Sequence, residues 1–115
     1  MSYKHQGLAA GRWNELSLLE QMGNIGSEVE RAIKWKEKGN REYSMSAFER
    51  ALELSDLTLA DPKNRLRLKE VARMREVLVD FFYGTNQFAS SDKSFRDYFL
   101  HFALAARRKH TNPGA

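Results

Sequence analysis

Apolar side chains recur along most of the chain at steps of three and four residues, the spacing that gathers them on one face of an α-helix. The first such stripe lies within residues 14–38 and the second within residues 40–60. A third runs through residues 62–83 and a fourth through residues 92–109. No segment shows the strict alternation that is typical of a half-buried β-strand. The pattern therefore predicts an all-α protein with four helices.

Each predicted helix carries one stripe that we expect to form the core. The expected core residues are Leu18, Met22, Ile25, Val29 and Ala32 in the first helix, Phe48, Ala51, Leu52, Ser55 and Leu59 in the second, Leu68, Val71, Met74, Leu78, Phe81 and Phe82 in the third, and Phe95, Phe99, Phe102 and Ala106 in the fourth. Their heptad-like spacing suits the packing of a helical bundle.

Capping residues mark where the helices begin and end. Asn14 can cap the first helix, and Ser17 offers a second start with a capping box. Gly39 stands where a C-terminal cap belongs. Asp61 can cap the third helix, and Pro62 suits its first turn. Because the links between the helices are short, neighbouring helices should be antiparallel, and the prediction is an up-down-up-down four-helix bundle.

Two glycines interrupt the first predicted helix. Gly23 and Gly26 each cost about 1 kcal/mol relative to alanine in a helix interior. Small residues at this spacing let another helix or another chain approach closely, whereas a local kink is the competing interpretation.

The composition fits one domain. The chain has 115 residues, 42% of them hydrophobic and 30% charged, and it has no cysteine. Residues 1–11 and 110–115 are expected to be flexible tails around residues that form a single bundle. No apolar run is long enough to span a bilayer, and no signal peptide is apparent, so a cytoplasmic location is expected. No glycine-rich phosphate loop and no cofactor motif is found.

Charge is unevenly distributed along the chain, whose formal net charge is +4. Residues 40–61 carry two basic and five acidic side chains. Residues 62–84 carry six basic and three acidic ones, and residues 85–115 carry five and two. The basic residues 62–115 can bind nucleic acid, or they can simply pack beside the acidic segment 40–61.

Basic side chains near the start of the third helix are the nucleic-acid-binding candidates. Arg65, Lys69 and Arg73 are spaced four residues apart, and Arg107 and Arg108 add positive charge near the end of the fourth helix. Cations at a helix N-terminus interact unfavourably with the helix dipole. Their presence there indicates a function rather than a contribution to stability. The alternative is that carboxylates of the second helix neutralise them.

Three carboxylates share one face of the second predicted helix. Glu49, Glu53 and Asp56 are spaced four and three residues apart. Such a set can hold Mg²⁺ or Mn²⁺, but the second half of a known two-helix acidic motif is absent. Solvation, or pairing with the third helix, is the preferred interpretation, and no metal site is predicted.

One short motif carries candidate chemistry. Arg96, Asp97 and His101 match the pattern R-[N/D/H]-x-x-x-H, which resembles the signature of HEPN domains, a family of small helical bundles that includes ribonucleases. The resemblance implies a dimer that cleaves RNA without metal. In it Arg96 would stabilise phosphate charge and His101 would transfer protons. Asp97, one turn before the histidine, would orient its ring.

A second resemblance concerns the chain as a whole. The segments WNELSLLEQM, IGSEVERAI and KGNREYS resemble an uncharacterised group of small prokaryotic helical proteins. The size and charge are similar to those of basic four-helix accessory subunits that accompany some prokaryotic reverse transcriptases. Leu100 and Leu104, one turn apart on the outer face of the last helix, favour a homo-oligomer.

These observations predict a binding and oligomerisation module. We expect a small basic helical bundle that works as an accessory protein beside RNA, DNA or a nucleic-acid enzyme, or that binds a protein partner. A HEPN-type ribonuclease that uses Arg96 and His101 is the alternative.

Overall fold

A computed structural model of the chain describes residues 11–111, and the side chains of residues 11–108. In that part the chain forms four α-helices and no β-strand. The α-helices are α2 (Leu18–Glu37), α3 (Arg41–Ala60), α4 (Leu68–Phe82) and α5 (Asp92–Thr111), and two short 3-10 helices are η1 (Trp13–Glu15) and η2 (Pro62–Arg67). The predicted all-α fold is confirmed.

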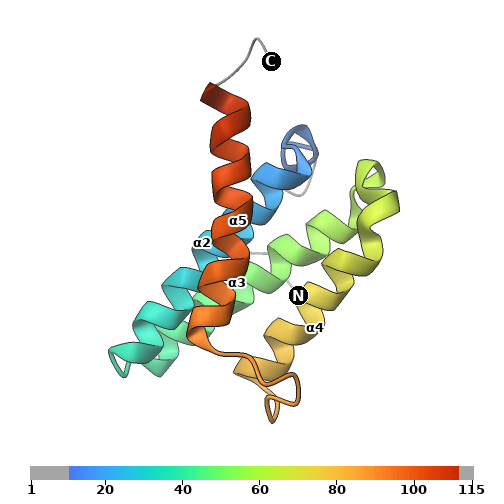
Figure 1. Cartoon of the computed structure of the whole chain (residues 1–115). Coiled ribbons are helices and arrows are strands. Elements are labelled where there is room, and N and C mark those ends of the chain that lie inside the picture. The colour runs from blue at the N-terminus through green and yellow to red at the C-terminus, as the bar shows by residue number, and fades with distance from the viewer. Residues whose placement is uncertain (1–10, 112–115) are drawn as a thin grey trace.

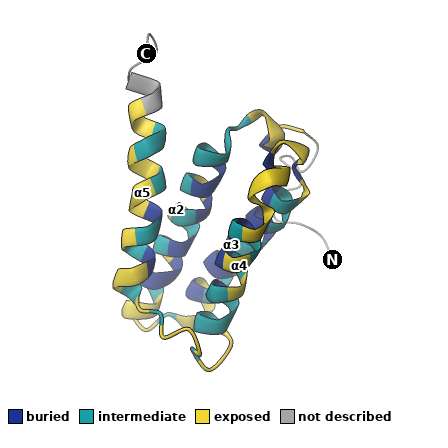
Figure 2. Ribbon diagram, turned by 45° about the vertical axis from the view of Figure 1, so that its right-hand side comes forward, coloured by how far each residue is buried: buried dark blue, intermediate teal, exposed yellow. Residues whose placement is uncertain are grey.

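The four α-helices form one bundle. Helix α2 packs against both α3 and α5, and α4 packs against α3 (Figure 1). Helices α4 and α5 also meet, since the ring centroids of Phe81 and Phe95 lie 5.0 Å apart. Because short connections reverse the chain after each helix, successive helices run in opposite directions, as the up-down-up-down prediction requires. The last turns of α5 extend past the other helices and stand apart from them (Figures 1 and 2).

The core contains residues from every α-helix and from η1. The buried hydrophobic residues are Trp13, Met22, Ile25, Val29, Ala32, Ile33, Ala47, Phe48, Ala51, Leu54, Val71, Met74, Leu78, Phe95 and Phe99. The other expected core positions are at least partly buried, except Leu68, for which the prediction is wrong. Leu68 is 37% exposed because it begins α4 at the end of the bundle, where η2 turns the chain.

The ends of α2 follow the predicted capping chemistry with one correction. Ser17 and Glu20 form the complete capping box, and Asn14 lies in η1 instead of starting the helix. At the other end Gly39 has a φ of 78°, which glycine adopts without strain. The amide of Gly39 donates to Lys36 O and that of Asn40 donates to Trp35 O, the paired bonds of a Schellman cap.

A buried polar cluster joins η1, α2, α3 and η2. The indole Nε1 of Trp13 donates to Thr58 Oγ1 at 3.0 Å. The amide of Gln21 donates to Asp61 Oδ2 at 2.8 Å, and Asn64 Nδ2 donates to Gln21 Oε1 at 2.8 Å. All five side chains are at most 3% exposed. We call these five residues the polar cluster.

The polar cluster explains why the third predicted helix does not begin as an α-helix at residue 62. Asp61 caps the segment by accepting the Lys63 amide, as predicted. Asn64 must then turn inward to reach Gln21 and Thr58 O, and residues 62–67 wind more tightly as η2. Burial raises the pKa of Asp61, but hydrogen bonds from Lys63 and Gln21 outweigh burial and leave that pKa below its ordinary value.

The predicted tails fall largely outside the described residues. Helix α5 continues to Thr111, two residues beyond its expected end. Of the expected N-terminal tail only Gly11 is described, and residues 112–115 of the C-terminal one lie outside the described range.

Candidate nucleic-acid interface

Three basic residues with a common setting lie on η2 and α4. Lys69 and Arg73 belong to α4, but Arg65 belongs to η2. The three residues therefore do not lie on one α-helix, contrary to the prediction from their spacing. All three side chains are exposed. Among the side chains of residues 11–108, no carboxylate forms an ion pair with any of them. We call these three residues the cation stripe.

The carboxylates expected to neutralise the cation stripe are engaged elsewhere or buried. Asp56 Oδ1 accepts a hydrogen bond from Arg75 Nε at 2.7 Å, so α3 and α4 are linked through a different arginine. Glu53 is only 8% exposed, and Glu49 is exposed on α3. Pairing between the second and third predicted helices is therefore confirmed for Asp56, but it leaves the cation stripe uncompensated.

Arg73 is held by an aromatic ring from the loop between α4 and α5. Its guanidinium carbon lies 4.6 Å from the centroid of the Phe88 ring, and Phe88 is 43% exposed. The loop is held in place by Asp80, whose carboxylate accepts the amides of Gln87 and Phe88 at 2.8 and 3.0 Å. The stack therefore orients the Arg73 guanidinium at the surface, where it can meet an anion.

Arg107 and Arg108 lie on the last turns of α5 and are exposed. With His101 and Leu104 they border a shallow hollow on that helix. Figures 1 and 2 show that this end of α5 stands apart from the start of α4. Arg107 and Arg108 therefore do not form one continuous basic surface with the cation stripe.

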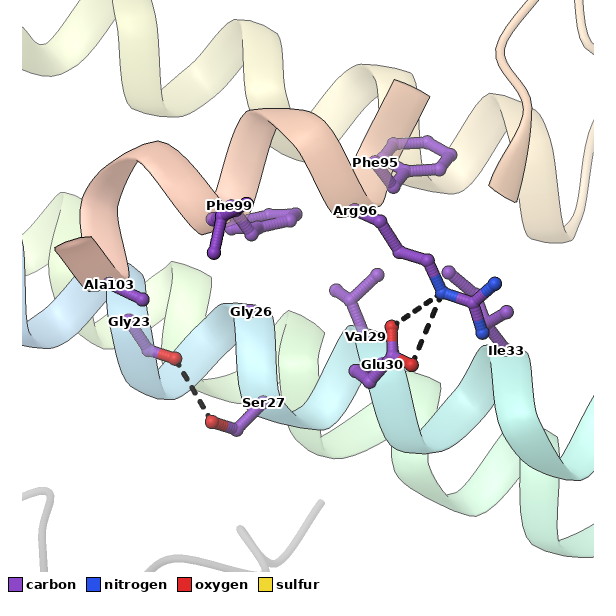
Figure 3. Close-up of a pocket in the computed structure, with 11 residues that line it drawn as sticks. Gly23, Gly26, Ser27, Val29, Glu30, Ile33, Phe95, Arg96, Phe99 and Ala103 are labelled. Atoms are coloured by element: carbon purple, nitrogen blue, oxygen red, sulfur yellow. Dashed lines mark hydrogen bonds and ion pairs between the residues drawn. The ribbon is translucent and has the colours of Figure 1, made fainter. Parts of the chain in front are cut away.

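Arg96 links α5 to α2. Its Nε donates to Glu30 Oε2 at 2.9 Å (Figure 3). Its Nη2 donates to Glu37 Oε1 at 2.8 Å. These hydrogen bonds, to Glu30 first and then to Glu37, raise the pKa of the Arg96 guanidinium. The positive charge that the HEPN resemblance would direct at a phosphate is thus already matched by two carboxylates.

Asp97 and His101 lie on the exposed side of α5. Asp97 Oδ2 accepts a hydrogen bond from Lys93 Nζ at 2.6 Å, and this bond raises the pKa of Lys93. His101 is exposed and lies by Arg107 and Arg108, whereas Arg96 points to α2. A single chain does not bring Arg96, Asp97 and His101 together as a catalytic group.

An apolar groove lies between α2 and α5 on the side that Figure 3 shows. It has a volume of about 490 Å³ and is lined by Gly23, Gly26, Ser27, Val29, Glu30, Ile33, Phe95, Arg96, Phe99, Leu100 and Ala103. Gly26 lies directly under Phe99, so it lets α5 approach α2, as one interpretation of the glycines predicts. Gly23 faces open space.

A second concavity, which the sequence interpretation missed, lies between α4 and α5. This α4–α5 cleft has a volume of about 300 Å³ and is lined by Glu70, Arg73, Met74, Val77, Ser90, Ser94, Phe95 and Tyr98. The available signal was the spacing of Ser90, Ser94 and Tyr98, which recur every four residues. That spacing indicates a polar edge beside the Phe95 stripe, but not which helix faces it.

The described residues contain no group of three or more histidine, aspartate or glutamate side chains that could hold a metal ion. In the same range no helix has the length and apolarity needed to cross a bilayer. Comparison with family models, with curated proteins and with solved structures finds no match to this chain. The HEPN resemblance and the resemblance to small prokaryotic helical proteins therefore stay predictions.

Proposed function

We propose that this chain is a small helical-bundle accessory module that binds RNA or DNA through the cation stripe. The observation that carries the proposal is that Arg65, Lys69 and Arg73 are exposed along one helical run, lack carboxylate partners among the described side chains, and end at a guanidinium that the Phe88 ring orients. Among the side chains of residues 11–108, eight other basic ones form ion pairs with carboxylates of the same range: Arg31, Lys36, Arg50, Lys63, Arg67, Arg75, Lys93 and Arg96. Unpaired cations on one face are what a phosphate backbone requires.

The expected salt dependence follows from the number of cations. If each of the three contacts one phosphate, the logarithm of the binding constant falls with the logarithm of salt concentration with a slope of about −2 for single strands and −3 for duplex. Raising salt from about 50 to 200 mM should weaken binding about 20- to 40-fold. Contacts to phosphates alone carry no base sequence preference.

The test is charge reversal with a matched control. The triple variant Arg65→Glu, Lys69→Glu, Arg73→Glu should lose binding to a fluorescent oligonucleotide while its circular dichroism spectrum stays helical. The control is the triple variant Lys34→Glu, Lys38→Glu, Arg41→Glu, which changes net charge equally at another exposed set without described carboxylate partners. Equal loss in both variants would show that net charge, and not the cation stripe, determines binding.

We also propose that the module forms a homo-oligomer through the outer face of α5. Leu100 is 54% exposed and Leu104 is 44% exposed, and Leu100 lines the apolar groove beside Gly23. Exposed leucines one turn apart on a helix that extends past its neighbours are typical of a surface that meets a partner. A second copy is the simplest partner, since symmetric dimers are the commonest oligomers.

A further inference from the structure

The α4–α5 cleft opens beside the last member of the cation stripe. Arg73 lines the cleft, and Arg65 and Lys69 precede it on the same helical run. A polyanion that follows the three cations therefore passes the mouth of the cleft. The concavity is at the lower end of the size range of small-ligand sites, which suits one flat ring system.

We propose that the α4–α5 cleft receives one unpaired base of a single-stranded nucleic acid whose phosphates lie on the cation stripe. The proposal rests on the proposed function, because the stripe supplies the electrostatic attraction. It adds a substrate class, since a base in a duplex is paired and stacked and cannot enter.

The charges around the cleft separate a base from a phosphate. Glu70 lines the cleft, and its Oε2 accepts from Arg67 Nε at 2.9 Å. This ion pair leaves the Glu70 side of the cleft without net positive charge to attract a phosphate. Glu70 Oε1, which accepts no hydrogen bond from the described residues, can accept from the amino group of a base, as acidic side chains do from cytosine. The anionic backbone is thus directed outward to Arg73 and the neutral ring inward.

The walls of the cleft suit the faces and edges of a base. Met74, Val77 and Phe95 form apolar surface, and Met74 and Phe95 belong to the core. Tyr98 adds an aromatic ring, and among the described residues no group hydrogen-bonds to its hydroxyl. Burial, with a smaller effect from Glu70, raises the pKa of Tyr98 to about 12, so the hydroxyl remains a donor at neutral pH. Rings of this kind stack on bases of any sequence.

The experiment compares a single-stranded RNA 12-mer with the blunt duplex of the same length, by fluorescence anisotropy at one salt concentration. Wild type should bind the single strand about 10-fold more tightly than the duplex, as one stacked base would give. Val77→Trp, which fills the cleft, should remove this preference and keep the duplex affinity. Ala60→Trp is the control, because Ala60 is exposed and does not line the cleft.

The outcomes distinguish the base site in the α4–α5 cleft from nucleic-acid binding by the cation stripe. Equal affinity of wild type for both oligonucleotides, or a preference that survives Val77→Trp, would overturn the base site and leave the cation stripe as the binding surface. Binding to neither oligonucleotide would overturn the proposed function as well. If Val77→Trp does not fold, Tyr98→Ala replaces it, and it should reduce single-strand affinity about 10-fold with duplex affinity unchanged.

Discussion

Alanine substitutions at the two glycines of α2 should change stability in opposite directions. A Cβ at Gly26 would lie 2.7 Å from Phe99 Cβ and 2.9 Å from Phe99 Cγ. Phe99 Cβ moves only with its backbone, so α5 must shift from α2. Overpacking of this kind costs about 1–3 kcal/mol, and the better helix propensity of alanine returns about 1 kcal/mol. Gly26→Ala should therefore reduce the free energy of unfolding by up to about 2 kcal/mol.

Gly23→Ala is the matched control three residues away on the same helix. A Cβ there would meet no atom within 4 Å, so only the helix propensity changes. The free energy of unfolding should rise by about 0.5–1 kcal/mol. The two variants change the same residue type in the same way, and only the close approach of Phe99 distinguishes them.

The assay is urea denaturation followed by circular dichroism, together with thermal melting. A difference of 1 kcal/mol shifts the midpoint temperature of a domain this size by about 4–8 °C. Wild type should lie between the two variants in both measurements. If Gly26→Ala is as stable as Gly23→Ala, α5 does not rest on α2 through Gly26, and the packing of the fourth helix is wrong.

Three further predictions concern charge, catalysis and assembly. Because its folded-state pKa is lowered, Asp61 stabilises the fold fully above its unfolded pKa of about 4, and this contribution disappears as pH falls through the folded-state value. Asp61→Asn should thus lower the free energy of unfolding at pH 7, measured by urea denaturation. Between pH 5 and about 2 this free energy should fall less in the variant than in wild type, and an equal fall in both proteins would contradict the prediction. His101→Ala should bind RNA as wild type does, with no cleavage by either protein in EDTA; cleavage by wild type alone would favour the HEPN-type ribonuclease. Light scattering at high micromolar concentration should show that wild type is a dimer. The double variant Leu100→Glu, Leu104→Glu should be a folded monomer. A monomeric wild type would refute the proposed homo-oligomer.

The helices could be predicted because their cores repeat at a local spacing. Each apolar stripe, through Ile25, Phe48, Leu78 or Phe99, can be recognised from residues three and four positions away in the sequence. The start of the third helix could not be predicted in the same way. Whether residues 62–67 form an α-helix or η2 depends on Asn64 reaching Gln21, which lies 43 positions earlier.

The site was predicted less completely than the fold, for a similar reason. Exposure of the cation stripe follows from the amphipathic pattern of the third helix. Which arginine meets Asp56 depends on how α4 is rotated against α3, and the structure pairs Arg75 there. Likewise Arg96 pairs with Glu30, 66 positions earlier, so no local pattern separates an interhelical link from a catalytic candidate.

The polar cluster determines the alignment of the helices along the bundle axis. Leucine and isoleucine contacts have no direction, so an apolar stripe displaced by one turn still meets apolar partners. Hydrogen bonds are directional. Sliding α3 along α2 by one turn, about 5.4 Å, would leave the Trp13 indole buried without Thr58 and would break the bond between Gln21 and Asp61. These bonds thus select one alignment among several with similar burial. The consequence is mutational coupling, in which a second substitution within the polar cluster costs less than the first.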